Sequence, residues 1–196
     1  MTRNLFPAVQ LGGEERQITA LLTDLKGFFR ATSDLSPVQR MDFLNKHFER
    51  LGEVVEKHEG TLDKFMGDSL LVTFNTQRRQ PDHARRAVRC AWEMIASLRS
   101  WDDPDAEKMH LGIGLSSGTA AVGNLGTNTY NEFTAIGRPV NEAALLSGKA
   151  KPDEILLTKA TQELAGEVAV VEQTGAEGVF RLTGVQAPKG TDAQGG

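Results

Sequence analysis

Apolar residues recur at steps of three and four between residues 36 and 60, a spacing that is typical of an amphipathic helix. The segment Ser36-Pro37-Val38-Gln39 predicts where this helix begins. Ser is a preferred N-cap, Pro favours the first helical position, and Gln three residues after the Ser completes a capping box. Gly60 is expected to end the helix. The predicted buried stripe consists of Met41, Leu44, Phe48, Leu51 and Val55.

Short runs of apolar and β-branched residues predict strands. Residues 18–23 are mostly apolar, which indicates a strand that is buried on both faces. Residues 61–66 and 69–74 flank the pair Gly67-Asp68. This arrangement predicts a β-hairpin, because Gly accepts the positive φ of a tight turn. The hairpin turn would then present the carboxylate of Asp68.

A second strand pair is predicted at residues 110–116 and 119–124, with Ser117-Gly118 as its turn. Two hairpins exclude an all-parallel sheet. The mixed order of elements predicts an α+β fold, in which helices cover one side of a largely antiparallel sheet. Further strands are predicted at 132–136, 154–158, 168–172 and 179–182, and further helices start at Pro81-Asp82, span 140–147 and end at Leu164.

The length and the ends of the chain indicate a single domain. A chain of 196 residues can bury a sizeable core. We expect the domain to occupy residues 16–185. Residues 1–15 show little hydrophobic periodicity. This predicts a flexible lead-in or the stub of a linker from an upstream domain. Residues 186–196 end in a run of small and polar side chains, which predicts a frayed tail.

Charge and cysteine content narrow the function classes. A net charge of −4 argues against broad nucleic-acid affinity, which requires a basic face. It leaves open one small phosphate-bearing ligand. The single cysteine, Cys90, excludes an internal disulfide and fits a reducing compartment. No apolar run approaches the ~20 residues of a membrane span, and the N-terminus lacks the pattern of a signal peptide. We therefore expect a cytoplasmic protein.

Two carboxylates and a lysine are the candidate functional-site residues. Asp68 lies in the predicted hairpin turn, Lys64 precedes it on the incoming strand, and Asp24 ends an earlier apolar strand. Paired carboxylates can hold a metal ion, and a Gly turn after Asp24 can offer backbone N–H groups to phosphate oxygens. Structural roles are the alternative: Asp is common in turns and caps, and a strand Lys often protects a sheet edge.

The sequence motifs resemble the catalytic domain of class III adenylate and guanylate cyclases, of bacterial type. The resemblance covers about residues 15–158 and continues more loosely to about residue 189. Lys189-Gly190 matches the family pattern only loosely. The matching segments are LLTDLKGFF at 21–29, GTLDKFMGDSLLVTF at 60–74, GIGLSSGTAAVGNLG at 112–126, EFTAIGRPVNEAALLSG at 132–148 and AKPDEILLT at 150–158.

The resemblance implies a ferredoxin-like α+β core, the class III nucleotide cyclase fold. It also implies a head-to-tail homodimer that binds ATP in the cleft between two copies and converts it to 3′,5′-cyclic AMP and pyrophosphate. Two divalent cations, Mg²⁺ or Mn²⁺, would be held by Asp24 and Asp68, with the carbonyl of Leu25 as a further ligand. Backbone N–H groups of Gly27 and Phe28 would bind the triphosphate.

The resemblance also assigns residues to the base and the ribose. Lys64 would read the purine together with Thr134, and Asn141 would orient the ribose and the transition state. Lys64 donates hydrogen bonds only, whereas the Thr134 hydroxyl donates or accepts. Adenine presents N1 as an acceptor and its amino group as a donor, and guanine presents the reverse. We therefore predict ATP rather than GTP as the substrate.

The sequence departs from the family pattern at Leu145. Active members carry an arginine four residues after the asparagine, on the same helical face. A cation that stabilises charge developing in the transition state contributes roughly 10²- to 10³-fold in rate. We therefore predict a weak or conditional adenylate cyclase. The alternatives are an ATP-binding regulatory domain with little turnover, and one half of a heterodimer whose partner chain supplies the arginine.

Overall fold

The computed structural model describes residues 11–103, 109–127 and 129–187. The predictions for residues 1–10, for the tail beyond residue 187 and for Lys189 lie outside the described residues. The first half of the chain contains β1 (Gly12–Lys26), α1 (Phe28–Ala31), α2 (Pro37–Lys57), β2 (Thr61–Met66), β3 (Ser69–Phe74) and α3 (His83–Arg99). The second half contains β4 (His110–Gly126), β5 (Asn131–Ile136), α4 (Arg138–Lys149), β6 (Glu154–Thr158), α5 (Lys159–Ala165), β7 (Ala169–Gln173) and β8 (Val179–Val185).

The strands form one mixed sheet in the order β2-β3-β1-β4-β6-β8-β7, and β5 pairs with the outer part of β4. The pairing of β4 with β6 is parallel, and the other pairings are antiparallel. The predicted α+β fold with a largely antiparallel sheet is confirmed. Within the described residues, no helix has the length and apolar character that a bilayer crossing requires.

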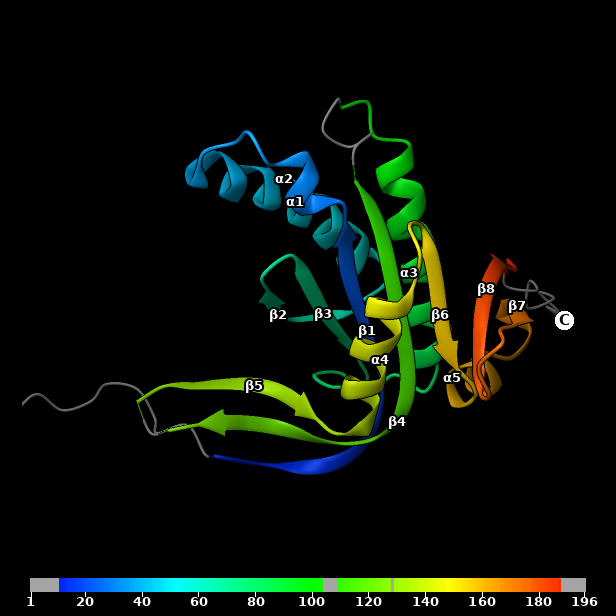
Figure 1. Cartoon of the computed structure of the whole chain (residues 1–196). Helices are drawn as coiled ribbons and strands as arrows, with labels where there is room; N and C mark the ends of the chain where they lie inside the picture. Colours follow the sequence, from blue (N-terminus) through cyan, green and yellow to red (C-terminus); the bar gives the residue numbers. More distant parts are fainter. Residues whose placement is uncertain (1–10, 104–108, 128, 188–196) are drawn as a thin grey trace, which may run out of the picture.

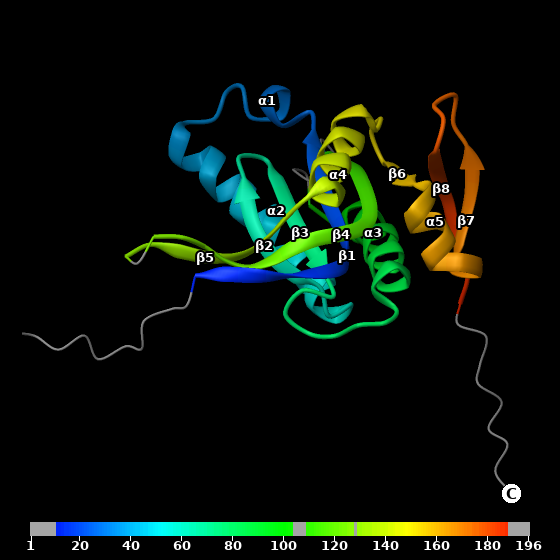
Figure 2. The same cartoon turned by 90° about the horizontal axis from the view of Figure 1, so that it is seen from below.

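Helices cover both faces of the sheet, so the prediction of helices on one side is wrong. Side chains alternate along β1: Leu21 and Leu25 join the large core under α2 and α3, whereas Ala20 and Leu22 pack with Ala143 of α4. Figures 1 and 2 show α3 and α4 on opposite sides of β1 and β4. Because β1 and β4 lie in the middle of the sheet, both of their faces are buried.

The predicted turn at Ser117-Gly118 is wrong, because β4 is one continuous strand. Gly118 pairs with Ile18 of β1. The small residues at alternate positions of β4 face α4 instead. A Cβ atom on Gly114 would overlap the carbonyl oxygen of Ala143, and one on Gly118 would lie 3.5 Å from Cγ of Pro139. Gly114 therefore allows α4 to approach the sheet closely, whereas a methyl group at Gly118 would make an ordinary van der Waals contact.

The ordered domain begins earlier than predicted. Residues 12–15, expected to belong to the lead-in, form the first part of β1, where Gly12 pairs with Asn124 and Glu15 with Ala121. The strands approach closely here, because a Cβ atom on Gly123 would overlap the carbonyl oxygen of Gly12. Together with β5, this part of β1 and β4 forms an arm that extends from the body of the domain (Figure 1).

The predicted start of α2 is confirmed. The amide of Gln39 donates to Oγ of Ser36 at 3.3 Å, and the amide of Ser36 donates to Oε1 of Gln39 at 2.8 Å. The helix ends at Lys57, and the left-handed residue after it is Glu59, with φ of 56°, rather than Gly60. Gly60 is required for another reason, because its Cβ atom would lie 2.9 Å from Cζ of Phe74.

Two single-residue predictions had different outcomes. Met41 is 64% exposed and does not belong to the buried stripe of α2, whose buried side includes Phe43 and Phe48. Cys90, the single cysteine, is fully buried within α3. Burial raises the pKa of its thiol, so the side chain remains protonated and unreactive.

Gly114→Ala is expected to destabilise the domain by about 1–3 kcal/mol or more, because an added methyl group has no room between β4 and α4. Urea unfolding followed by circular dichroism measures this change. Gly52→Ala is the control. A Cβ atom there meets nothing within 4 Å, and Ala is favoured over Gly in a helix by about 1 kcal/mol. Unchanged stability of Gly114→Ala would contradict this packing.

Candidate active site

Asp24 and Asp68 lie close together at one end of the central strands. Asp24 pairs with Ser69 across β1 and β3, and Asp68 immediately precedes Ser69 in the β2–β3 turn. Gly67 has φ of 65°, which confirms the predicted tight turn. Burial raises the pKa of Asp68, and the charge of Asp24 acts in the same direction, while Asp68's own amide and Lys26 oppose it. The two carboxylates therefore repel one another across a short distance.

A lysine already compensates part of this negative charge. Nζ of Lys26 lies 2.6 Å from Oδ2 of Asp24 and donates to the carbonyl oxygens of Ser147 and Gly148, at 3.0 and 3.2 Å, near the C-terminus of α4. Gly112 leaves room for this side chain, because a Cβ atom there would overlap Cε of Lys26. The environment of Asp24 thus favours positive charge.

The donor set fits a hard divalent cation. Asp24 and Asp68 supply carboxylate oxygens, which Mg²⁺ and Mn²⁺ prefer. The pairing of β1 with β3 ends at Asp24, so Leu25 has a strand neighbour only on the β4 side. In the described ranges, no cluster of three or more His, Cys, Asp or Glu side chains is suited to a metal. Backbone, substrate or water oxygens would complete the coordination.

Gly27 and Phe28 lie where β1 changes into α1. Gly27 has φ of 90°, and its carbonyl accepts from the amide of Ala31 at 2.8 Å, which closes the first turn. The first N–H groups of a helix have no acceptor within the helix. Gly27 and Phe28 follow Asp24 by three and four residues, and their contact with phosphate oxygens stays a prediction.

A second group of polar side chains gathers where β2 faces β5. Leu62 pairs with Val72 and Lys64 pairs with Leu71, so Asp63 is the extra residue of a β-bulge. Neighbouring side chains in a regular strand point to opposite faces, but a bulge redirects them. Asp63 and Lys64 therefore both reach side chains of β5.

Asp63 accepts from the hydroxyl of Thr134 and from the next backbone amide of β5. Its side chain is only 3% exposed. Oγ1 of Thr134 lies 2.8 and 3.0 Å from the two carboxylate oxygens, and the amide of Ala135 donates to Oδ2 at 3.3 Å. Sequence reasoning did not single out Asp63, and in a regular strand its side chain would point to the face opposite Lys64. Only the bulge makes the two side chains neighbours.

Lys64 lies between two carboxylates. Its Nζ atom is 2.6 Å from Oε1 of Glu132 and 3.4 Å from Oδ1 of Asp63. Burial opposes the charge, but the hydrogen bonds and charges of Glu132 and Asp63 prevail and raise the pKa of Lys64. Lys64 is therefore a permanently charged donor at neutral pH. Glu132 was also missed, although its position two residues before Thr134 places both on one face of β5.

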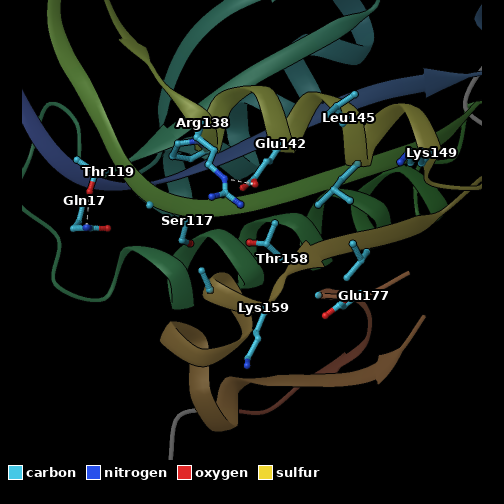
Figure 3. A pocket seen from close by; sticks show the side chains of 16 residues that line it. Gln17, Ser117, Thr119, Arg138, Glu142, Leu145, Lys149, Thr158, Lys159 and Glu177 are labelled. Carbon is cyan, nitrogen blue, oxygen red and sulfur yellow. Dashed lines mark hydrogen bonds and ion pairs between the residues drawn. The ribbon is translucent and has the colours of Figure 1, made fainter. Parts of the chain in front are cut away.

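Asn141 and Leu145 lie one turn apart on the exposed side of α4. Leu145 is 63% exposed and presents an apolar side chain at the predicted arginine position. Arg138 is held by an ion pair with Glu142 at 2.6 Å, and Glu142 also accepts from the Ser116 hydroxyl at 2.7 Å. Figure 3 shows Arg138 directed toward Glu142. The Arg138 side chain is therefore already paired with Glu142 along the side of α4.

A cavity beside α4 does not include the predicted metal ligands or base-reading residues. It has a volume of about 700 Å³ and extends between α4 and the start of α5 (Figure 3). Leu145 and Lys149 line it, but the two predicted metal ligands and the two predicted base-reading residues do not.

One chain therefore contains two separate groups of predicted site residues. Asp24 and Asp68 form one, and Lys64 and Thr134 form the other. Within the part of the chain that the structure describes, no hydrogen bond or ion pair joins the two groups. Asn141 stands apart from both on α4.

The fold and the paired carboxylates define a nucleotide cyclase domain. Residues 13–186 match the family of the adenylate and guanylate cyclase catalytic domain, so the chain belongs to this family. Guanylyl cyclase Cya2 has a similar crystal structure, with a TM-score of 0.81 and 30% sequence identity over 91% of this chain and 98% of that chain. The predicted family and the predicted cyclase fold are both confirmed.

Further similarities extend to bacterial proteins. Adenylyl cyclase CyaB from P. aeruginosa shares the fold, with a TM-score of 0.79 and 24% identity over 92% of this chain and all of that chain. The uncharacterized protein Rv1318c of Mycobacterium tuberculosis strain H37Rv is 32% identical over 160 residues, which is 81% of this chain. The chain spans only 29% of the length of that relative.

Asp68→Asn is expected to stabilise the metal-free protein, because it removes a partly buried charge that lies beside Asp24. It should also weaken cation binding. At a Mn²⁺ concentration about 100 times the dissociation constant, the wild type should gain roughly 2.7 kcal/mol of stability, and the variant much less. Thermal unfolding with EDTA and with Mn²⁺ measures both effects.

Asp42→Asn, at an exposed position of α2, is the matched control and should behave like the wild type in both conditions. An equal response of wild type and Asp68→Asn to Mn²⁺ would show that Asp68 is not a cation ligand.

Proposed function

We propose that this domain is an adenylate cyclase, which converts ATP to 3′,5′-cyclic AMP and pyrophosphate. The observation that carries the proposal is the pair of groups on β2 and β5: a charged donor, Lys64, beside the hydroxyl of Thr134, which the Asp63 carboxylate holds. Lys64 matches adenine N1, which accepts a hydrogen bond, and Thr134 matches the adenine amino group, which donates one. Guanine presents N1–H and a carbonyl oxygen at these positions.

Asp24 and Asp68 are the proposed ligands of two divalent cations, Mg²⁺ or Mn²⁺, together with the carbonyl of Leu25. When bound, such cations activate the ribose 3′-hydroxyl and neutralise the charge of the leaving group. In the reaction, the 3′ oxygen forms a bond to the α-phosphorus, and the bond to the pyrophosphate oxygen breaks. Backbone N–H groups of Gly27 and Phe28 bind the triphosphate in this proposal, and Asn141 orients the ribose.

The separation of the two groups supports a site shared between two copies of the chain. In a head-to-tail homodimer, Asp24 and Asp68 of one copy meet Lys64 and Thr134 of the other. Twofold symmetry then creates two equivalent sites. The β2–β3 hairpin contributes to both, with its turn in one site and its bulge in the other.

The side chain of Leu145 supports low activity. An aliphatic side chain cannot stabilise charge on the phosphoryl group, and the nearest described arginine on α4, Arg138, is paired with Glu142. A partner chain that supplies an arginine, or a regulatory role in which ATP binds without turnover, are the competing functions. The much longer relative leaves room for an upstream sensor domain that regulates the reaction.

Purified protein at high concentration is expected to form cyclic AMP slowly from ATP and Mn²⁺. Leu145→Arg should raise the rate roughly 10²-fold, because it restores a cation in a preorganised site. Asp24→Ala should abolish product formation. Ala144→Arg is the matched control, since it adds the same charge about 100° away around the helix and should not raise the rate.

The outcomes distinguish the competing functions. ATP binding without product, in the wild type and in Leu145→Arg, would favour the regulatory role and contradict the proposed activity. Turnover that appears only after mixing with an arginine-bearing cyclase chain would favour the heterodimer.

A further inference from the structure

We infer that Asp63 is a positioning residue that sets the choice of ATP over GTP, because it fixes the Thr134 hydroxyl as a hydrogen-bond acceptor toward the base. The inference rests on the proposed function and deepens it. Neither the family match nor the motifs that indicated the cyclase assign a role to this residue. The evidence is the geometry of the bulge in β2 and the burial of the groups around it.

The hydrogen bonds determine where the Thr134 hydrogen points. Oγ1 of Thr134 lies 2.8 and 3.0 Å from the two oxygens of Asp63. An ionised carboxylate has no hydrogen to donate, so the hydroxyl hydrogen must point toward Asp63. The amide of Ala135 and Nζ of Lys64, at 3.3 and 3.4 Å, supply further positive charge that keeps the carboxylate in place.

The consequence for the base follows from the single hydrogen of a hydroxyl. Once this hydrogen is directed to Asp63, only lone pairs of Thr134 are available to a ligand. Lone pairs accept the amino hydrogen of adenine but repel the carbonyl oxygen of guanine. Lys64 beside it donates to adenine N1 and cannot accept from the N1–H of guanine. The acceptor and the donor together match adenine alone.

Burial makes this discrimination effective. Thr134 is 4% exposed and the Asp63 side chain 3%, so water has little access to compensate a mismatched group. A polar group left unpaired in a buried site carries a large penalty. Without Asp63, the Thr134 hydroxyl would be free to rotate and donate to the carbonyl oxygen of guanine. The site would then accept either adenine or guanine at this position.

The test compares the ratio of kcat/KM for ATP and for GTP in the wild type and in Asp63→Asn. The amide of Asn has the same shape but can donate to Thr134, which releases the hydroxyl hydrogen toward the base. We expect the ATP/GTP ratio to fall by roughly tenfold or more. Inosine triphosphate presents the same N1–H and carbonyl oxygen as guanine but lacks the 2-amino group. Its kcat/KM relative to ATP should rise in Asp63→Asn as much as that of GTP. If turnover is slow, competition binding against a fluorescent ATP analogue gives the ratio of the dissociation constants for ATP and GTP, which should shift in the same direction.

Thr134→Val is the second variant, and it keeps the test valid if Asp63→Asn folds poorly. Removal of the hydroxyl should lower the ATP preference by itself. In the Thr134→Val background, Asp63→Asn should change the ratio no further, because Asp63 acts only through that hydroxyl.

Three results would overturn the inference. If Asp63→Asn lowers kcat/KM for ATP and for GTP by the same factor, the role of Asp63 is only structural, as a link between β2 and β5. An unchanged ratio in Thr134→Val would exclude the hydroxyl from base recognition. Both of these results leave an ATP-selective wild type and so leave the proposed function intact. A wild type that prefers GTP would overturn the proposed function together with the inference.

Discussion

The structure depends on the long antiparallel pairing of β1 with β4, which runs from Gly12 opposite Asn124 to Lys26 opposite His110. This pairing fixes Asp24 at one end of the sheet and supports the extended arm at the other. It also provides the surface for α4, because the glycines of β4 face that helix and let its backbone approach. Asp24, the β5 strand and Asn141 thus take their places from one strand pair.

Much of this arrangement was predictable from local sequence patterns. The capping box at Ser36, the Gly67-Asp68 turn and the apolar strand before Asp24 each combine residue types that favour a single local conformation. The failures came from residues whose role depends on distant partners. Ser117-Gly118 has the composition of a turn, yet it lies in a strand, where Ser117 pairs with Thr19 and Gly118 with Ile18 of β1. Likewise, the left-handed residue after α2 is Glu59, whereas Gly60 packs against Phe74.

The predicted site residues were found by resemblance, but their surroundings required the structure. Spacing alone does not reveal that a bulge turns Asp63 and Lys64 toward the same strand, nor that Glu132 holds the lysine. These surroundings determine the chemistry, because a hydroxyl donates or accepts according to its neighbours, and an ammonium group is held in one position by them. Similarly, Lys26 is visible in the sequence, but its contact with Asp24 and with the end of α4 is not.

We propose that a complete site requires the carboxylates of one copy and the base-reading groups of another. Mixing two variants, Asp24→Ala and Lys64→Ala, and measuring cyclic AMP formation tests this most directly. Each variant alone should lose most of its activity. The mixture should recover roughly a quarter of the wild-type rate, because half of the randomly paired dimers contain one intact site of two. No recovery in a mixture that forms dimers as the wild type does would contradict the shared site.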